Sequence, residues 1–257
     1  MKIISELFYR NESLAWFGLA NLILFVLAWV AYIVDNRILN GVNVWVKPMK
    51  FALALWILTW TLAWIMYYLP QSKSVLIIQW IVLITMTIEQ LCIFSQAGRG
   101  VMSHFNVQSG WYNGAIFQVM GFAITIHTFA ITYLTYLFFK ESVDLPDSYL
   151  WGIRLGLVMF VLFSLEGFVM GALLKHTIGA ADGGKGIPFL NWSINAGDLR
   201  VAHFIGIHAL QIVPLVGYIV MILGGHFGYT LGFGFIYFCI SCFTFVQAML
   251  GKPLFGF

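Results

Sequence analysis

The sequence predicts an all-α integral membrane protein, a bundle of about seven transmembrane helices with long ordered loops on one face. Hydrophobic residues make up 61% of the 257 residues and charged residues only 9%, which is too little charge to cover a soluble fold. Apolar runs of about 20 residues, the length needed to cross a bilayer, recur along the chain. These runs lack strict alternation of apolar and polar residues, which favours helices over a closed barrel.

Seven apolar runs are expected to be the membrane spans. They cover residues 13–34, 51–69, 75–94, 115–139, 150–174, 201–223 and 229–250. No tandem repeat or second domain is evident, so residues 1–257 are predicted to form a single transmembrane bundle. The small, scattered net charge of +3 argues against a nucleic-acid partner. The predicted partners are membrane lipid and an anionic or lipid-like substrate.

The connections between the spans differ in length between the two faces. Short connections with helix-ending Pro, Gly and Ser residues lie on the face where the chain begins, at 71–74, 140–149 and 224–228. Long connections lie on the other face, at 35–50, 96–114 and 175–200. Long loops are usually functional, so a site is expected under this face. The face also holds most of the Lys and Arg residues, and the positive-inside rule therefore favours a cytoplasmic position for it.

Ionisable side chains inside spans cost about 2.5–3.5 kcal/mol each to insert and therefore indicate function. Among them are Glu89, His127, Glu166, His203 and His208. Counted from the long-loop face, Glu89, Glu166 and His208 each lie about seven to nine residues deep. This common depth predicts a polar site beneath the loops. Glu89, Glu166 and His208 are its candidate catalytic residues.

Imidazole and carboxylate groups on several helices are the ligands with which bundles hold divalent metals. The candidate metal ligands are His203, His208, His104 and His176, the last two in the capping loops. Zn, Fe or Cu is the favoured cofactor, with haem as the alternative. A haem held by His127 and His208 would meet a depth mismatch of about 7 Å. His203 and His208 lie about 140° apart on one helix, so they face one small ion only if the helix distorts.

Three basic residues near the long-loop face are predicted to bind a cofactor or an anionic headgroup. They are Arg99, Arg200 and Lys47. Guanidinium and ammonium groups bind phosphate and carboxylate groups at a membrane surface. The alternative is structural: Glu89 and Glu166 each pair with a base such as Lys47, Lys50 or Arg200 and only tie the helices together.

Four stretches on the long-loop half of the chain resemble the marks of an uncharacterised family of bacterial multi-pass membrane proteins. They are Lys47-Pro-Met-Lys-Phe51, Arg99-Gly-Val-Met-Ser-His-Phe-Asn106, His176-Thr-Ile-Gly179 with Asp182-Gly-Gly184, and Gly197-Asp-Leu-Arg-Val-Ala-His-Phe-Ile-Gly-Ile-His-Ala-Leu-Gln211. The resemblance spans most of the chain and implies a location in a bacterial inner membrane. It implies no activity, substrate or cofactor.

The sequence leaves three functions open. The first is a membrane-embedded metalloprotein, redox-active or a metal-dependent enzyme, with an intramembrane His/Glu site under a loop cap. The second is a small proton-coupled transporter or channel, in which Glu89, Glu166, His127 and His208 form a proton relay. The third is a sensory or assembly subunit without catalysis, whose polar cluster only fixes the register of the helices.

Overall fold

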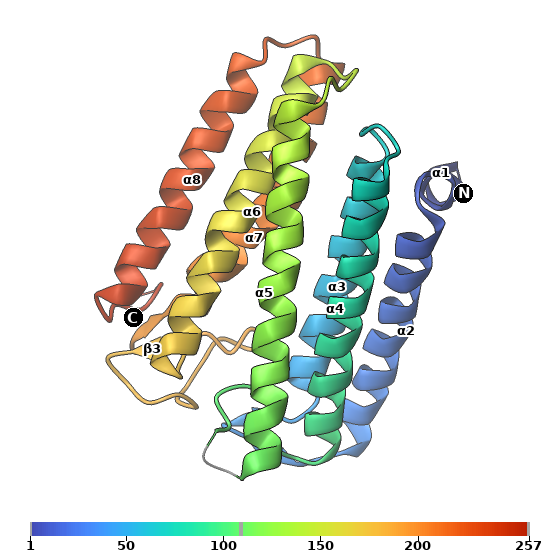
Figure 1. The fold of residues 1–257 in the computed structure, drawn as a ribbon. Helices are drawn as coiled ribbons and strands as arrows, with labels where there is room; N and C mark the ends of the chain where they lie inside the picture. Colours follow the sequence, from blue (N-terminus) through green and yellow to red (C-terminus); the bar gives the residue numbers. More distant parts are fainter. Residues whose placement is uncertain (1, 108–109, 256–257) are drawn as a thin grey trace. The chain divides into compact units, whose positions relative to one another are not determined.

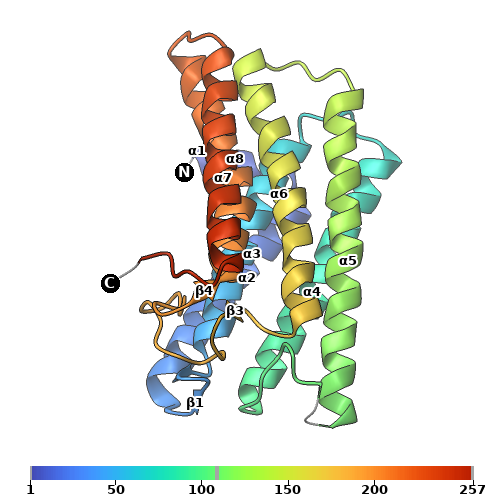
Figure 2. The same cartoon turned by 90° about the vertical axis from the view of Figure 1, so that its left-hand side faces the viewer.

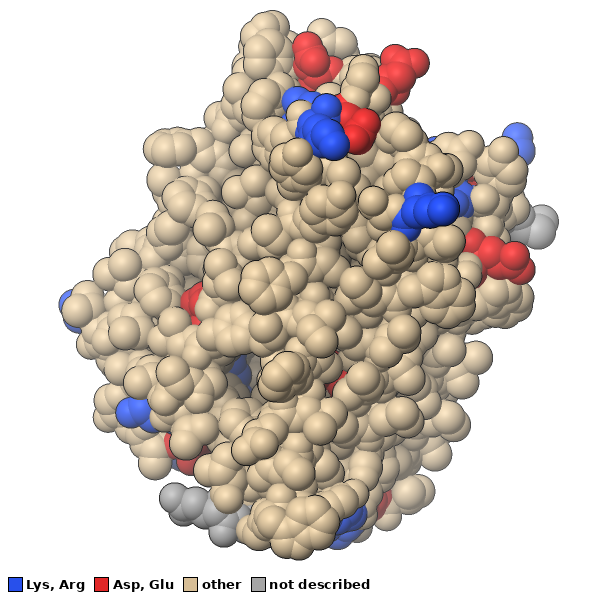
Figure 3. Space-filling model, viewed as in Figure 1, with Lys and Arg blue, Asp and Glu red and all other residues tan. Residues whose placement is uncertain are grey.

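The structure is a computed structural model that describes residues 2–107 and 110–255. It confirms the all-α class: the described residues form eight helices, and seven of them are long and apolar enough to cross a membrane. Charged side chains are sparse on the molecular surface, as the face in Figure 3 shows. The chain is therefore a multi-pass integral membrane protein.

The seven candidate spans follow one another along the chain. They are α2 (Glu12–Val34), α3 (Val46–Met66), α4 (Lys73–Gly98), α5 (Trp111–Lys140), α6 (Asp147–Leu173), α7 (Leu199–Ile222) and α8 (Gly228–Met249). A shorter helix, α1 (Lys2–Arg10), precedes them. Two antiparallel strand pairs lie in the long loops: β1 (Ile38–Leu39) with β2 (Val42–Asn43), and β3 (Thr177–Ile178) with β4 (Gly197–Asp198).

The chain folds as two compact units, Met1–Ala130 and Ile131–Phe257. Helix α5 begins in the first unit and ends in the second. Figure 1 shows α2, α3 and α4 in the first unit, and α6, α7 and α8 in the second. The single bundle that the sequence predicts stays a prediction.

In the first unit, α2 and α3 pack closely where a small residue meets a large one. A Cβ atom at Gly18 would lie 2.2 Å from Cδ1 of Trp60, so glycine is needed for this approach. The Trp60 indole donates a hydrogen bond of 3.1 Å to the carbonyl of Ala15 on α2. This bond satisfies the indole N–H inside the hydrocarbon region, where no water can replace it.

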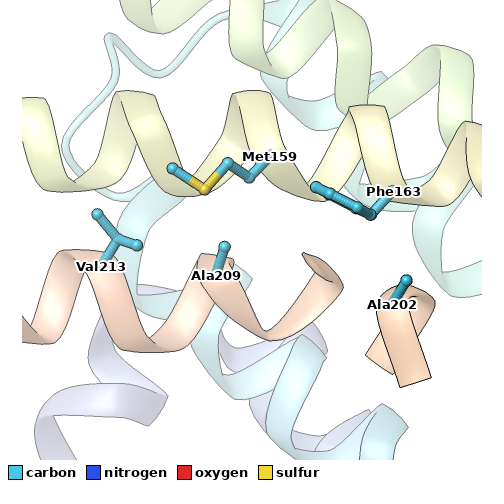
Figure 4. Close-up of a cluster of buried hydrophobic side chains, with 5 residues drawn as sticks. All are labelled: Met159, Phe163, Ala202, Ala209 and Val213. Atoms are coloured by element: carbon cyan, nitrogen blue, oxygen red, sulfur yellow. The ribbon is translucent and has the colours of Figure 1, made fainter. Parts of the chain in front are cut away.

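In the second unit, α6 and α7 form the most extensive helix contact. Figure 4 shows the core between them, in which large side chains of α6 face small side chains of α7. This cluster consists of Met159, Phe163, Ala202, Ala209 and Val213. Such small-residue contacts let helix backbones approach closely, and close packing drives helix association in lipid. Gly152 and Gly156 extend the close contact by facing Pro214 inside α7.

The long loop of the second unit lies at the same end as the segment that follows α8 (Figure 2). Gly179 and Gly197 make this contact: a Cβ atom at Gly197 would lie 2.0 Å from the carbonyl oxygen of Ala248. A Cβ atom at Gly179 would lie 3.6 Å from Cα of Gly251. The loop is therefore an ordered cap on its unit, as the sequence predicts.

Two features of the first unit differ from the sequence prediction. Helix α3 starts at Val46, five residues before the predicted start, so Lys47 lies on a helix and not in a loop. The Pro at position 48 suggests a break, but proline is tolerated in the first helical turn, where its missing N–H has no helical partner to lose. Helix α1 was not expected, because its sequence is too polar to count as a span.

Candidate functional site

The second unit brings one predicted acid and one predicted base together. Glu166 on α6 and His203 on α7 approach to 3.3 Å between Oε2 and Nδ1. The approach is possible because Gly167, beside Glu166, has no side chain: a Cβ atom there would lie 3.2 Å from Cε1 of His203. Glu166 is only 7% exposed. A carboxyl group and an imidazole thus meet inside two membrane spans.

The hydrogen bonds of His203 fix its tautomer. Its Nδ1 atom lies 2.7 Å from the carbonyl oxygen of Phe163, and a carbonyl can only accept, so Nδ1 carries the hydrogen. In the neutral ring Nε2 then keeps its lone pair and can accept a proton or bind an electrophile. The imidazole is oriented by the backbone of α6, one turn from Glu166.

The Glu166 carboxyl group is not satisfied by hydrogen bonds. Neither of its oxygen atoms has a hydrogen-bond partner among the described residues. The Nδ1 hydrogen of His203 is directed at Phe163, so the contact with Glu166 is one of charge and proximity. An ionised carboxylate without partners is unfavourable in hydrocarbon. Glu166 is therefore a group that a proton or a cation would stabilise.

His208 has a different environment from His203. Its Nδ1 atom donates 2.7 Å to the carbonyl of Phe204 in its own helix, and the two rings lie 4.1 Å apart. His203, in contrast, bonds to α6. The imidazoles of His203 and His208 therefore bond to different helices, as their angular separation on α7 predicts.

His176 is held within the capping loop by Asp182. The Nδ1 atom of His176 lies 3.0 Å from Oδ2 of Asp182, which also accepts hydrogen bonds from the backbone N–H groups of His176 and Thr177. Burial alone would raise the pKa of Asp182, but these hydrogen bonds hold it well below its usual range. The charged form of Asp182 therefore stabilises the loop.

Replacing Asp182 with Asn is expected to destabilise the protein by about 2 kcal/mol at pH 7, because charge-assisted hydrogen bonds are lost. The folded pKa lies below the unfolded value of about 3.9, so the stabilisation is fully present above about pH 4 and is lost as the pH falls. Thermal unfolding in detergent between pH 3 and 7 tests this. Asp144→Asn, at an exposed loop residue, is the control. A wild-type advantage that stays constant down to pH 3 would contradict the assignment.

Arg200, a predicted anchor for an anion, already has a carboxylate partner. Asp198 is 2% exposed and contacts the Arg200 guanidinium at 2.6 and 2.9 Å. The same carboxylate caps α7 by accepting from the Arg200 backbone N–H, and it accepts from Ser193 N–H at 2.7 Å. Arg200 therefore stabilises the start of α7 through its contacts with Asp198.

The first unit holds a second polar group, at the start of α3. Lys47 Nζ lies 3.0 Å from Nδ1 of His104, and Ser103 Oγ lies 3.1 Å from the same atom. Glu89 on α4 is 4% exposed and close enough to Lys47 for their charges to interact. His127 on α5 is 1% exposed, with Nδ1 3.5 Å from Oγ1 of Thr85. Lys47 thus links a buried acid to a loop histidine.

Arg99 lies at the C-terminal end of α4 in the first unit. Its Nη1 atom donates to Oε1 of Gln96 at 2.5 Å and to Oδ1 of Asn113 at 3.0 Å, and its guanidinium lies 4.6 Å from the Tyr112 ring centroid. No carboxylate within the described parts of the chain forms a salt bridge with Arg99. Arg99 is therefore oriented by neutral groups, and no carboxylate among the described residues neutralises its charge.

The four predicted metal ligands are not gathered into one centre within either unit. His104 belongs to the first unit, and His176, His203 and His208 belong to the second. Within residues 2–107 and 110–255, no group of three or more His, Cys, Asp or Glu side chains is placed to hold a metal ion. The divalent metal and the haem stay predictions.

Two contacts of these polar groups could not be predicted from the sequence. The Phe163 carbonyl orients His203 through the backbone, and every residue has such a carbonyl. Lys47 bonds to His104 across 57 residues of sequence. The Lys-Pro pair at the start of α3 could have indicated a helix start, because proline is frequent in first turns.

No protein-family model matches the chain, and no match was found among curated proteins or solved structures. The resemblance to a bacterial multi-pass family stays a prediction. Function is therefore argued from the geometry of the chain alone.

Proposed function

We propose that the chain is a proton-coupled membrane transporter whose proton-binding site is the Glu166–His203 pair. The observation that supports this function is the Glu166 carboxyl group: it is buried inside a span, lacks hydrogen bonds among the described residues and lies 3.3 Å from an imidazole. Ionisable groups in this situation are typical of proton pathways in pumps and transporters. The missing hydrogen bonds also favour transport over a structural role, because a carboxyl group that only joined two helices would be expected to have hydrogen-bond partners.

The pair has two states that differ by one proton. With a neutral imidazole and an ionised Glu166, it carries one negative charge, which hydrocarbon disfavours. Protonation at Nε2 of His203, or at Glu166 itself, makes the pair neutral overall. The neutral state is suited to an interior closed to water, and the charged state to one that water reaches. This difference would couple proton binding to a conformational change.

The polar group of the first unit supports the same proposal. Glu89 is also buried inside a span, and its Oε1 atom has no hydrogen-bond partner in the described part of the chain. The nearby Lys47 contacts the imidazole of His104. Each unit therefore carries a membrane-embedded carboxyl group with a basic neighbour. Two such groups suit a proton path better than a single structural contact does.

The metalloprotein hypothesis has less support from the geometry. Catalytic zinc sites use three protein ligands and structural sites use four. In the described part of the second unit, His and carboxylate side chains meet only in pairs, Glu166 with His203 and Asp182 with His176. Metal analysis of the purified protein separates the two hypotheses. Stoichiometric metal that is lost in His203→Ala would favour a metal centre in place of a proton site.

The proposal is tested by infrared spectroscopy and by proton flux. Wild-type protein is expected to show a protonated-carboxyl band that disappears in Glu166→Gln. In vesicles with a trapped pH dye, proton movement driven by a pH gradient is expected to fall about tenfold or more in the same variant. Glu141→Gln, outside the spans, is the control that keeps both signals.

Two outcomes contradict the proposal. If no carboxyl band changes in Glu166→Gln at any pH, the site does not bind a proton. If the band is present but the wild type moves protons no faster than empty vesicles, proton transport by the chain alone is excluded and a sensory or assembly function is favoured.

A further inference from the structure

We infer that the first unit binds an anionic phospholipid, with an acyl chain in a groove between α4 and α5 and the headgroup on Arg99. This inference goes beyond the proposed function, because it concerns other residues in the other unit. It rests on the shape of the groove, on its length along α5 and on the charge of Arg99 near its α5 end. Figure 2 shows both helices.

The groove between α4 and α5 has a volume of about 480 Å³, within the range of about 300–1,000 Å³ for small-molecule sites. Its walls are mainly aliphatic and aromatic. Representative lining residues are Ile81, Ile84 and Ile88 on α4 and Val119, Phe122 and Ile126 on α5. Thr85 and Gln118 are the polar members of the lining, and the Thr85 hydroxyl donates to the Ile81 carbonyl at 2.7 Å. The groove therefore presents an apolar wall that suits a hydrocarbon chain.

The length and position of the groove fit one leaflet of a bilayer. On α5 its lining runs from Ala115 to Ile126, a rise of about 16 Å along the helix. The hydrocarbon core is about 30 Å thick, so this length corresponds to about half of it. The Ala115 end lies two residues from Asn113, whose side chain accepts a hydrogen bond from Arg99. On α5 the groove thus begins two residues from the partner of Arg99, whereas on α4 its lining ends at Ile88, and it extends toward the middle of the span.

Arg99 supplies the charge that an anionic headgroup requires. It is exposed, and it lacks the carboxylate partner that Arg10, Arg37 and Arg200 each have. Both of its hydrogen bonds come from Nη1. Nε and Nη2 therefore have no acceptor among the described residues and are available to a phosphate, which guanidinium groups bind through two parallel bonds.

A phospholipid would occupy the apolar groove with an acyl chain and bind Arg99 with its headgroup. A free phosphate would use Arg99 and leave the groove empty, and a neutral lipid would fill the groove without using the charge. The exposed arginine at the end of an apolar groove thus favours a lipid with a net negative headgroup. Such a lipid would come from the leaflet on the side of the α4–α5 loop.

Native mass spectrometry of the delipidated full chain tests the inference, with phosphatidylglycerol and phosphatidylcholine of equal chain length as probes. Wild-type protein is expected to bind phosphatidylglycerol about fivefold more tightly, because one basic residue near a membrane surface contributes about 1 kcal/mol. Arg99→Gln should remove this preference. Lys73→Gln, which removes one positive charge at the other end of α4, should keep it.

A bulky substitution in the lining and a lipid with shorter acyl chains test the groove. Ala115→Trp, at the headgroup end of the groove, should weaken both lipids several-fold, whereas Leu91→Trp, an exposed α4 residue outside the lining, should weaken neither. Phosphatidylglycerol with six-carbon chains should bind several-fold more weakly than the long-chain lipid.

The inference is overturned by equal wild-type affinity for both headgroups, by unchanged preference in Arg99→Gln, or by equal binding of short-chain and long-chain lipid. Glu166→Gln should bind lipid like the wild type. If Glu166→Gln lost the lipid preference, the inference would be overturned as well. Failure of the lipid site and failure of the proton site are therefore distinguishable.

Discussion

Asp198→Ala is expected to destabilise the second unit by about 3–5 kcal/mol, the usual cost of removing one partner of a buried ion pair. The Asp198 carboxylate is almost fully buried and serves three groups: the Arg200 guanidinium, the Arg200 backbone N–H and the Ser193 backbone N–H. Alanine would leave both N–H groups without this acceptor and would leave the guanidinium only the Asn191 carbonyl. It would also remove the N-cap of α7, a loss of about 1 kcal/mol by itself.

The expected result is a large fall in the thermal unfolding temperature in detergent, accompanied by faster proteolysis of the loop at 174–198. Asp198→Asn is the informative companion variant, because it keeps one acceptor oxygen for the cap but loses the charge that Arg200 requires. Its stability should fall between those of the wild type and the alanine variant. If Asp198→Ala unfolds at the wild-type temperature, the cap does not depend on this carboxylate.

Gly206→Ala is expected to have the next largest effect, a loss of about 3 kcal/mol, at the upper end of the cost of overpacking. A Cβ atom at this position would lie 1.9 Å from Cγ and 2.3 Å from Cβ of Phe163. The Cβ atom of Phe163 is fixed to the backbone, so a change of rotamer cannot remove the clash. Helices α6 and α7 would have to separate.

Separation of these helices would also move the Phe163 carbonyl away from His203. The variant is therefore expected to lose stability and proton binding together, measured by denaturant titration and by the carboxyl band. Gly232→Ala on α8 is the matched control, because no atom lies within 4 Å of the added Cβ. It should stabilise the protein by up to about 1 kcal/mol through helix propensity. Equal effects of the two variants would contradict the close-packing argument.

The membrane-spanning helices could be predicted from the sequence because the bilayer imposes a simple requirement. Each span needs about 20 apolar residues with internal hydrogen bonds, and this requirement is local. The helix ends were less predictable. Pro48 marks the first turn of α3 and not a loop. The two strand pairs were not predicted, because β3 and β4 join residues about 20 positions apart and no local pattern specifies such a pairing.

The polar residues could be named from the sequence, but their partners could not. Glu166 and His203 stand out as ionisable residues within apolar runs, yet their approach depends on which helix faces meet. That choice is made by small residues such as Gly167 and Gly206, which permit close contact. The angular separation of His203 and His208 was predictable, since it follows from the helical repeat. The partner of Arg200 is only two residues away, at the N-cap of α7.

Two large apolar residues of the second unit's loop have left-handed backbone conformations, Leu174 at the C-cap of α6 and Phe189 within the loop. Leu174 and Phe189 have positive φ angles, 52° and 63°, where glycine would be less strained. This conformation costs a non-glycine residue about 1–2 kcal/mol. Both side chains are 45% exposed, so packing within the chain offsets only part of that cost. Burying a Leu or Phe side chain in an apolar medium contributes about 1.5–3 kcal/mol. We expect contact with lipid to offset the rest of this cost, so that thinning or removing the lipid should loosen the loop before the helices separate.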